Sequence, residues 1–325
     1  MCLVLGLWSL VLKSSIRSLW VFGPRFSFLG PGFSVLGTMP RHPFGANLSK
    51  ALAEAKDITQ DLDVVELWSG VGSIAGAAQE KFFKAETIEL TDGQDLTSKE
   101  GFKEAEAKVL RLGKGSLLWM GLPCKSFVFL NASNCKRNPY NQYKGDTSYQ
   151  PVKEGNLFAN EAKYLGQLAL QRGVQVVIEN PPQSTLWQYL PTSFMKQLSS
   201  SAVCHRCSFE KAPDGKRLWK QYKFYCSDPW IGDLQVGCKC QQGHIALTSK
   251  KDGKVTGKLD LLSESAAYPI ALGQAVISAW SSQDVHDPVG EPRASKRSWQ
   301  SLDVGDDNSP SSSASKPRRF WQEDI

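Results

Sequence analysis

The sequence predicts an α/β fold built on a largely parallel sheet. Residues 63–68 are predicted to form a strand that leads through a glycine turn into a helix of small residues, which is the strand–turn–helix unit of such sheets. Residues 117–120 are continuously apolar, as expected of a strand buried on both faces. The chain has 325 residues, 41% of them hydrophobic, which is enough for a sizeable core.

The expected elements alternate along the chain. Helices are expected at 48–56, 74–79, 99–111, 155–171 and from 268 onward, and strands at 63–68, 86–90, 117–120 and 174–178. The stretch 128–150 is long for a loop, and long loops are usually functional lids or disordered. Its basic and aromatic residues suit contact with phosphates and bases, and a solvated surface loop is the alternative.

The glycine turn after the first strand has the geometry that seats a nucleotide-like cofactor. Gly70 permits a tight turn, and Gly72 allows the backbone to approach a ligand. Glu89 lies about 20 residues further on, where an acidic residue commonly binds ribose hydroxyls. Two glycines alone are also compatible with an ordinary βα turn.

Two reactive side chains follow predicted strands. Cys124 comes after the run 117–120, beside Lys125, and Glu179 follows the run 174–178. Because ligands bind at the carboxyl ends of parallel strands, both residues are expected at one edge of the sheet. A thiol near a cation can be ionised and nucleophilic, whereas the alternatives are an inert buried cysteine and a helix-capping glutamate.

The pattern changes between residues 197 and 263. Cys238, Cys240 and His244 form a Cys-x-Cys-x3-His spacing, and Cys207 or Cys226 could supply a fourth ligand. Thiolates and imidazole are the ligands of tetrahedral structural zinc, so Zn²⁺ is expected at Cys207, Cys238, Cys240 and His244, with scattered free thiols as the alternative. A hairpin is expected over 217–226, in a basic stretch that includes Lys220 and suits nucleic acid.

The two ends of the chain differ from its middle. Residues 1–41 contain no Asp or Glu, and are interpreted as a transit peptide, the apolar part of a secretory signal, or sequence upstream of a native start at Met39. Residues 283–325 are predicted to be a disordered tail. Its basic clusters, 292–297 and 316–319, suit nuclear import or simple solubility. No apolar run reaches membrane-spanning length.

In order and spacing, these motifs resemble the cytosine-5 DNA methyltransferase family. Trp68-Ser-Gly-Val-Gly72 is similar to its Phe-x-Gly-x-Gly turn, Asp95-Leu-Thr97 to its Asp-Ile-Thr segment, and Pro123-Cys124 to its Pro-Cys nucleophile. Gly155-Asn-Leu-Phe158, Glu179-Asn180 and Gly273-Gln-Ala-Val276 resemble its Gly-x-Leu-Phe, Glu-Asn-Val and Gly-Asn-x-Val elements. The resemblance implies that S-adenosyl-L-methionine is bound by Trp68, Ser69, Gly70, Gly72, Glu89, Asp95, Leu96, Pro123, Leu157, Gln274 and Val276.

The resemblance also implies a catalytic set. Cys124 would be the nucleophile, Glu179 the acid, and Asn180 the residue that orients it. The family's Gln-x-Arg-x-Arg element is not clear here, and Lys220 is among the nearest candidates. The sequence departs from the family at Lys125, Val128, Pro181 and Gln274, where the family usually has Gln, Ser, Val and Asn respectively.

The implied fold is a Rossmann-like S-adenosylmethionine-dependent methyltransferase sheet with helices on both faces and a small Cys/His-containing insertion. The expected division is a catalytic domain at 42–196, a target-recognition-like region at 197–263 and a returning helix at 264–282. The implied activity is methyl transfer to C5 of cytosine in DNA, with RNA as an alternative substrate, by a monomer located in the nucleus, or in an organelle if residues 1–41 are a transit peptide.

Two other functions are compatible with the motifs. Asn180-Pro-Pro-Gln183 resembles the Asn-Pro-Pro-aromatic motif of enzymes that methylate exocyclic amino groups of adenine or cytosine, although Gln183 is not aromatic. A non-catalytic nucleic-acid-binding relative that kept the fold is the second alternative, which the departures around Cys124 favour.

Overall fold

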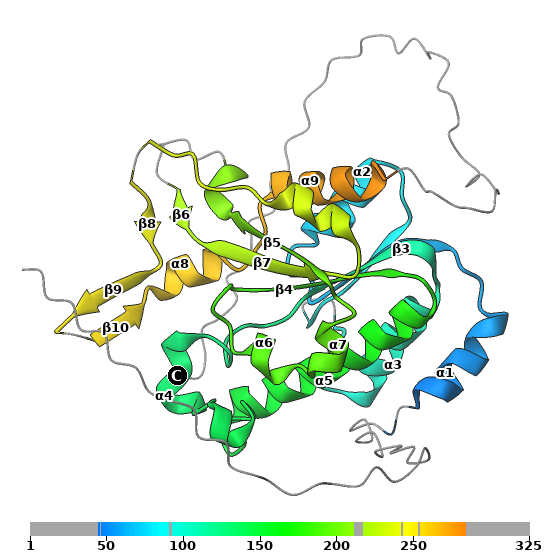
Figure 1. The fold of residues 1–325 in the computed structure, drawn as a ribbon, viewed down its shortest axis with the longest axis horizontal. Helices are drawn as coiled ribbons and strands as arrows, with labels where there is room; N and C mark the ends of the chain where they lie inside the picture. Colours follow the sequence, from blue (N-terminus) through cyan, green and yellow to red (C-terminus); the bar gives the residue numbers. More distant parts are fainter. Residues whose placement is uncertain are drawn as a thin grey trace, which may run out of the picture. The chain divides into compact units, whose positions relative to one another are not determined.

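A central sheet of six strands organises the computed structural model (Figure 1). The structure describes residues 45, 47–90, 93–210, 217–241, 243–252 and 254–283, so the predicted leader and nearly all of the predicted tail lie outside it. The strand order is β2-β1-β3-β4-β7-β5. Strands β1 to β4 are mutually parallel, and β7 runs antiparallel to both β4 and β5. The strands are β1 (Leu62–Leu67), β2 (Ala85–Ile88), β3 (Leu112–Gly121), β4 (Gln175–Asn180), β5 (Ser200–His205) and β7 (Gln221–Cys226).

Alternating side chains of the sheet supply two apolar cores. Val65, Leu118 and Ile178 pack with residues of α3 (Lys99–Leu110) and α5 (Gln150–Gln171). Val64, Leu117 and Val177 pack instead with α2 (Ser73–Glu80) and α9 (Ile270–Ser281). Both core faces are therefore covered by helices, as Figure 1 shows, and the predicted α/β class with helices on both faces is confirmed.

Local signals explain where several helices begin. The side chain of Ser98 accepts a hydrogen bond from the Gly101 amide and caps α3. Pro151 lies in the first turn of α5, where its missing amide costs nothing, so α5 begins at Gln150 rather than at the predicted Gly155. Helix α9 approaches α2 so closely that a Cβ at Gly273 would overlap the carbonyl of Ser73.

The predicted lid contains regular structure. Three short helices occupy it, namely η3 (Phe129–Asn131), α4 (Ala132–Cys135) and η4 (Pro139–Asn141). Reciprocal hydrogen bonds between Asn138 and Asn141 cap η4. The other described helices are α1 (Leu48–Glu54), η1 (Ala55–Asp57), α6 (Leu186–Tyr189), α7 (Thr192–Met195), η5 (Arg206–Ser208), η6 (Pro229–Leu234) and α8 (Leu259–Glu264).

The hairpin predicted over 217–226 is wrong. Tyr222, Phe224 and Cys226 alternate toward the core, so β7 inserts between β4 and β5 instead of folding back on its neighbour. The short strand β6 (Leu218–Trp219) pairs in parallel with β8 (Ile245–Ala246), and β9 (Thr248–Lys251) pairs with β10 (Lys254–Gly257). None of the described helices is long and apolar enough to cross a bilayer.

Candidate functional site

The topology brings the predicted site residues to one edge of the sheet. Strands β1 to β4 are parallel, so Trp68, Glu89, Cys124 and Glu179 follow or end their strands at the same edge. Strand β7 is antiparallel to β4, so β7 begins at this edge. Lys220, which directly precedes β7, therefore lies at the edge too. Ligands of open α/β sheets bind there.

The glycine turn has an unusual backbone and a direct bond to the predicted ribose acid. Trp68, Gly70 and Gly72 have φ values of 53°, 58° and 69°, in the left-handed region. The Gly70 amide donates to the Glu89 carboxylate at 2.7 Å. Ser69 is buried beneath this turn. The structure therefore joins the turn and the acid, which are separated in sequence, into one concave backbone segment.

The predicted adenine-side residues also border this turn. Asp95 accepts hydrogen bonds from the amide and hydroxyl of Thr97 before α3 begins, and Leu96 is buried. The ring of Trp68 packs edge-on against Phe158 of α5, with centroids 5.7 Å apart, and Leu157 is the partly buried residue before Phe158. Pro123 is exposed at the end of β3.

Two predicted cofactor residues are not brought to the turn. Gln274 donates to Glu80, which is the last residue of α2, whereas the turn precedes the first residue of that helix. Val276 is fully buried in the core between α2 and α9. Neither side chain is therefore shown to face the glycine turn.

The loop that carries Cys124 is held from two sides. The buried Asn180 donates to the carbonyl of Leu122 at 2.8 Å, which ties the end of β4 to the loop. The amide of Phe127 donates to the carbonyl of Cys124 at 2.8 Å and closes a turn. Asn180, which was predicted to orient Glu179, thus makes a bond to the Cys124 loop that the sequence did not predict.

Arg137 braces the same loop from the lid. Its guanidinium donates to the carbonyl and hydroxyl oxygens of Ser126 at 2.8 and 2.9 Å, and lies 3.9 Å above the ring of Phe127. A Cβ at Gly155 would overlap the Ser126 hydroxyl, so α5 passes directly beside the loop. No local pattern in the sequence indicates this role for Arg137, because its partners are set only by the fold.

Tyr268 is a site residue that the sequence analysis missed. Its hydroxyl donates to the Glu179 carboxylate at 2.7 Å, and both side chains are buried. A Cβ at Gly121 would lie 2.6 Å from that hydroxyl and 3.3 Å from the carbonyl of Trp68, so the glycine turn, β3 and Tyr268 meet here. The available signal was the aromatic residue directly before Pro269 at the start of a predicted helix.

Cys124, Glu179 and Lys220 interact electrostatically with one another. Burial raises the pKa of the Cys124 thiol, the Lys220 ammonium opposes that rise, and the Glu179 carboxylate adds to it. Burial also raises the pKa of Glu179, against the effects of Lys220 and the Tyr268 hydrogen bond. Burial lowers the pKa of Lys220, whose ammonium donates to the carbonyl of Ser265 at 2.5 Å. Such an arrangement is typical of an active site.

The four predicted metal ligands form one cluster. The ligand atoms of Cys207, Cys238, Cys240 and His244 all lie within 4.8 Å of one another. A tetrahedral zinc ion with Zn–S bonds of about 2.3 Å separates its sulfur ligands by about 3.8 Å, so small rotations would close the cluster on an ion. Cys226 lies in β7 outside this group.

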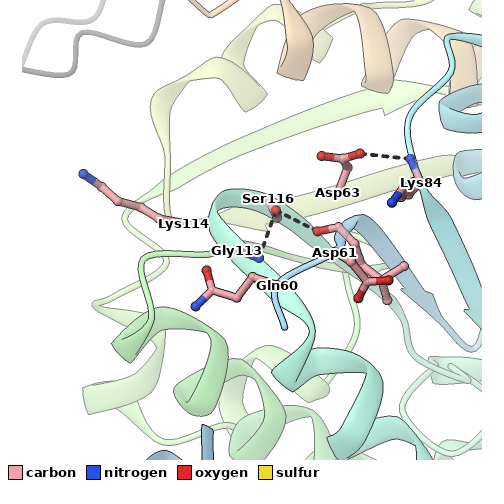
Figure 2. A pocket seen from close by; sticks show the side chains of 8 residues that line it. Gln60, Asp61, Asp63, Lys84, Gly113, Lys114 and Ser116 are labelled. Atoms are coloured by element: carbon pink, nitrogen blue, oxygen red, sulfur yellow. Dashed lines mark hydrogen bonds between the residues drawn. The ribbon is translucent and has the colours of Figure 1, made fainter. Parts of the chain in front are cut away.

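A polar depression of about 390 Å³ lies at the opposite edge of the sheet (Figure 2). Several of its lining groups are engaged in structural bonds: Asp63 accepts from the Lys84 amide, Ser116 donates to the Leu62 carbonyl, and Asp61 pairs with Arg111. The chemistry is assigned to the other edge, where Cys124 and Glu179 lie.

No protein-family model matches the sequence, and no curated protein matches it. Among solved structures, the chain is similar to the crystal structure of S. pombe Dnmt2 methyltransferase, with 11% sequence identity and a TM-score of 0.31. The similarity covers 56% of this chain and 57% of that chain, which is less than two thirds of its length. At these values the function is argued from the site.

Proposed function

We propose that the protein transfers a methyl group from S-adenosyl-L-methionine to C5 of cytosine in DNA, through a covalent bond between Cys124 and C6 of the base. The observation that carries this proposal is that a thiol, a buried carboxyl and a half-buried lysine lie at one edge of the sheet and shift one another's pKa values, next to a glycine turn bonded to Glu89.

The cofactor is proposed to occupy the glycine-turn side of this edge. Glu89 would bind the ribose hydroxyls, the backbone at Gly70 and Gly72 would approach the ligand, and Asp95 with Leu157 would border the adenine. S-adenosyl-L-methionine, when bound, supplies an electrophilic methyl group on a sulfonium.

The catalytic residues are proposed to activate the base. Attack by the Cys124 thiolate forms the S–C6 bond and moves the C5–C6 electron pair toward the ring. Glu179 is held neutral by burial, so it can donate a proton at N3 as charge develops there. C5 then takes the methyl group, and the electron pair of the broken S–CH3 bond stays on the sulfur, which leaves as a thioether. Removal of the C5 proton by a base expels the thiolate, and return of the N3 proton to Glu179 restores the ring.

Lys220 and Tyr268 are proposed to support these two groups. The Lys220 ammonium favours the thiolate form of Cys124, which burial otherwise disfavours. Tyr268 fixes one oxygen of Glu179 and leaves the other to face the base. Lys220 would thus replace the arginine element that the sequence lacks.

DNA is proposed as the substrate, with RNA as the alternative that the test compares. A cytosine inside a duplex cannot be reached, so it must be flipped into the pocket. The lid at 128–150, which Arg137 ties to the Cys124 loop, would close over it. A monomeric enzyme acting in the nucleus remains our proposal from the sequence.

We also infer that the cluster of Cys207, Cys238, Cys240 and His244 binds Zn²⁺ as a structural ion. Three thiolates and one imidazole, all within 4.8 Å, are the donor set and number that tetrahedral zinc prefers.

Covalent trapping on oligonucleotides that contain 5-fluorocytosine tests the activity. Fluorine at C5 blocks the final elimination, so we expect an adduct that survives denaturing electrophoresis, on DNA in preference to RNA. Cys124→Ser should abolish the adduct and leave S-adenosyl-L-methionine binding unchanged within about twofold. Cys226→Ser, which changes a buried cysteine of β7, is the matched control and should form the adduct. Adduct formation by Cys124→Ser, or none by the unmodified chain, contradicts the proposal.

The exocyclic-amine alternative makes a different product. In that reaction the amino group would donate to the Oδ1 atom of Asn180, which has no hydrogen-bond partner among the described residues, but Cys124 would have no role. Mass spectrometry of digested product DNA should detect 5-methylcytosine. N4-methylcytosine or N6-methyladenine would contradict the proposal, and DNA binding without methylation would indicate the non-catalytic relative.

A further inference from the structure

A short path of hydrogen bonds joins the Cys/His cluster to the catalytic carboxyl. It begins at Arg206, the buried neighbour of the ligand Cys207. The guanidinium of Arg206 donates to the carbonyl oxygens of Ala267 at 2.5 Å and Ser265 at 3.3 Å. Tyr268 follows Ala267 and donates to Glu179 at 2.7 Å. A displacement of the Cys207 segment would therefore be transmitted within a few residues to the carboxyl.

A second path joins the cluster to Lys220 through β6. Arg217, directly before β6, donates to the carbonyl of Cys207 at 2.7 Å and contacts the sulfur of Cys240 at 3.5 Å. Its own carbonyl accepts from the amide of Ile245, the residue after the ligand His244. Strands of two residues have little stability of their own, so β6 depends on these attachments.

Lys220 follows β6 directly and shares its attachments. Its carbonyl accepts from the Arg206 amide at 2.9 Å, and its ammonium binds the same Ser265 carbonyl as Arg206 does. The ring of Trp219 lies against both His205 and His244, at 5.0 and 4.8 Å between centroids. Both sides of the Lys220 backbone are thus held by segments that carry metal ligands.

We propose that the metal bound by Cys207, Cys238, Cys240 and His244 is a positioning centre for the catalytic pocket, which holds Lys220 and the Tyr268–Glu179 pair in place. This inference rests on the proposed function for the catalytic role of the pocket. The coupling between the metal cluster and the segments that carry Lys220 and Tyr268 does not depend on that role. A metal contributes its binding free energy to the order of the segments it joins, here 207 and 238–244. Without the metal, the segments at which the two hydrogen-bond paths begin are no longer joined to each other through an ion.

Amide hydrogen exchange measured on the full chain, before and after zinc removal by a chelator, tests the coupling. Elemental analysis should give about one zinc per chain, as expected for one closed four-ligand site. Zinc removal should raise exchange in 218–222 and 265–268 at least tenfold and leave β1 and β3 unchanged. Cys238→Ser should reproduce this result, whereas Cys226→Ser should keep both zinc and protection.

A second measurement reports on Lys220 itself. On zinc removal, the pH profile of the Cys124 alkylation rate should shift to higher pH. The Lys220→Met variant should show the same shift while it retains zinc. S-adenosyl-L-methionine binding, on the glycine-turn side, should persist without zinc.

Several outcomes would overturn the inference. These are a purified chain without zinc, loss of zinc with unchanged exchange at 218–222 and 265–268, or exchange that rises equally in β3, which would mean a merely global effect on stability. Failure of the proposed function is distinguishable, because a metal-loaded chain that shows the exchange coupling but forms no 5-fluorocytosine adduct would disprove the activity and leave the coupling intact.

Discussion

At the scale of single residues, the site is defined by three titratable groups, Cys124, Glu179 and Lys220, whose pKa values depend on one another. The place of Cys124 at the edge of the sheet was predictable, because a strand, a glycine and a proline precede it. Glu179 was predictable for the same reason. Tyr268 and Arg206 were not, because their partners lie 89 and 61 residues away in the chain and no local pattern specifies such bonds. The sequence therefore predicted that Cys124 and Glu179 lie at one edge of the sheet, but not which residues bond to their segments.

Lys220 provides a direct test at this scale. Because its ammonium lowers the pKa of the Cys124 thiol, Lys220→Met should raise that pKa and slow alkylation of Cys124 at pH 8, by about tenfold for one pKa unit. Iodoacetamide rates measured from pH 6 to 10 would show the shift. Lys223→Met is the matched control, since Lys223 lies over the ring of Tyr225 on the same strand. An unchanged profile for Lys220→Met would remove Lys220 from the site.

At the scale of elements, periodicity predicted the layers and missed one strand pairing. The strands β3 and β4 could be predicted from their apolar runs, because strands buried on both faces need continuous hydrophobicity. The role of β7 was misinterpreted as part of a hairpin because its pairing with β4 and β5 depends on the core it covers, not on a turn. Helix α5 was placed correctly except at its start, where Pro151 extended it.

The contact of α5 with the Cys124 loop is testable through a glycine. Gly155→Ala would place a methyl group against the Ser126 hydroxyl, and should cost about 1–3 kcal/mol of unfolding free energy and slow the formation of the 5-fluorocytosine adduct. Gly76→Ala in α2 is the control, because nothing lies within 4 Å of its added Cβ. It should stabilise the chain by roughly 0.5–1 kcal/mol. Denaturant unfolding measures the stability of both variants. If Gly155→Ala stabilised the chain as much as Gly76→Ala does, the close contact between α5 and the Ser126 hydroxyl would be contradicted.

At the scale of the whole molecule, two buried acids tie stability to pH. Burial raises the pKa of Glu66 in β1 to about 8 and of Glu161 in α5 to about 9. Glu66 accepts a hydrogen bond from the Ala75 amide, whereas neither carboxylate oxygen of Glu161 has a hydrogen-bond partner among the described residues. Both acids remain protonated in the folded chain at neutral pH, while the unfolded chain ionises them near their ordinary values.

The sign of the effect follows from proton uptake. Above pH 4.5 the unfolded state loses the Glu161 proton while the folded state keeps it, so unfolding becomes easier as the pH rises, until the folded group also ionises near pH 9. At pH 7 this effect lowers the free energy of unfolding by about 3 kcal/mol. Glu161→Gln should therefore gain stability relative to the unmodified chain between pH 5 and pH 8. Glu100→Gln, at an exposed site of α3, should show no such trend. Urea unfolding at pH 5 and at pH 8 would measure the difference in unfolding free energy. The same pH dependence in all three proteins would contradict the prediction, because it would mean that Glu161 is ionised in the folded chain.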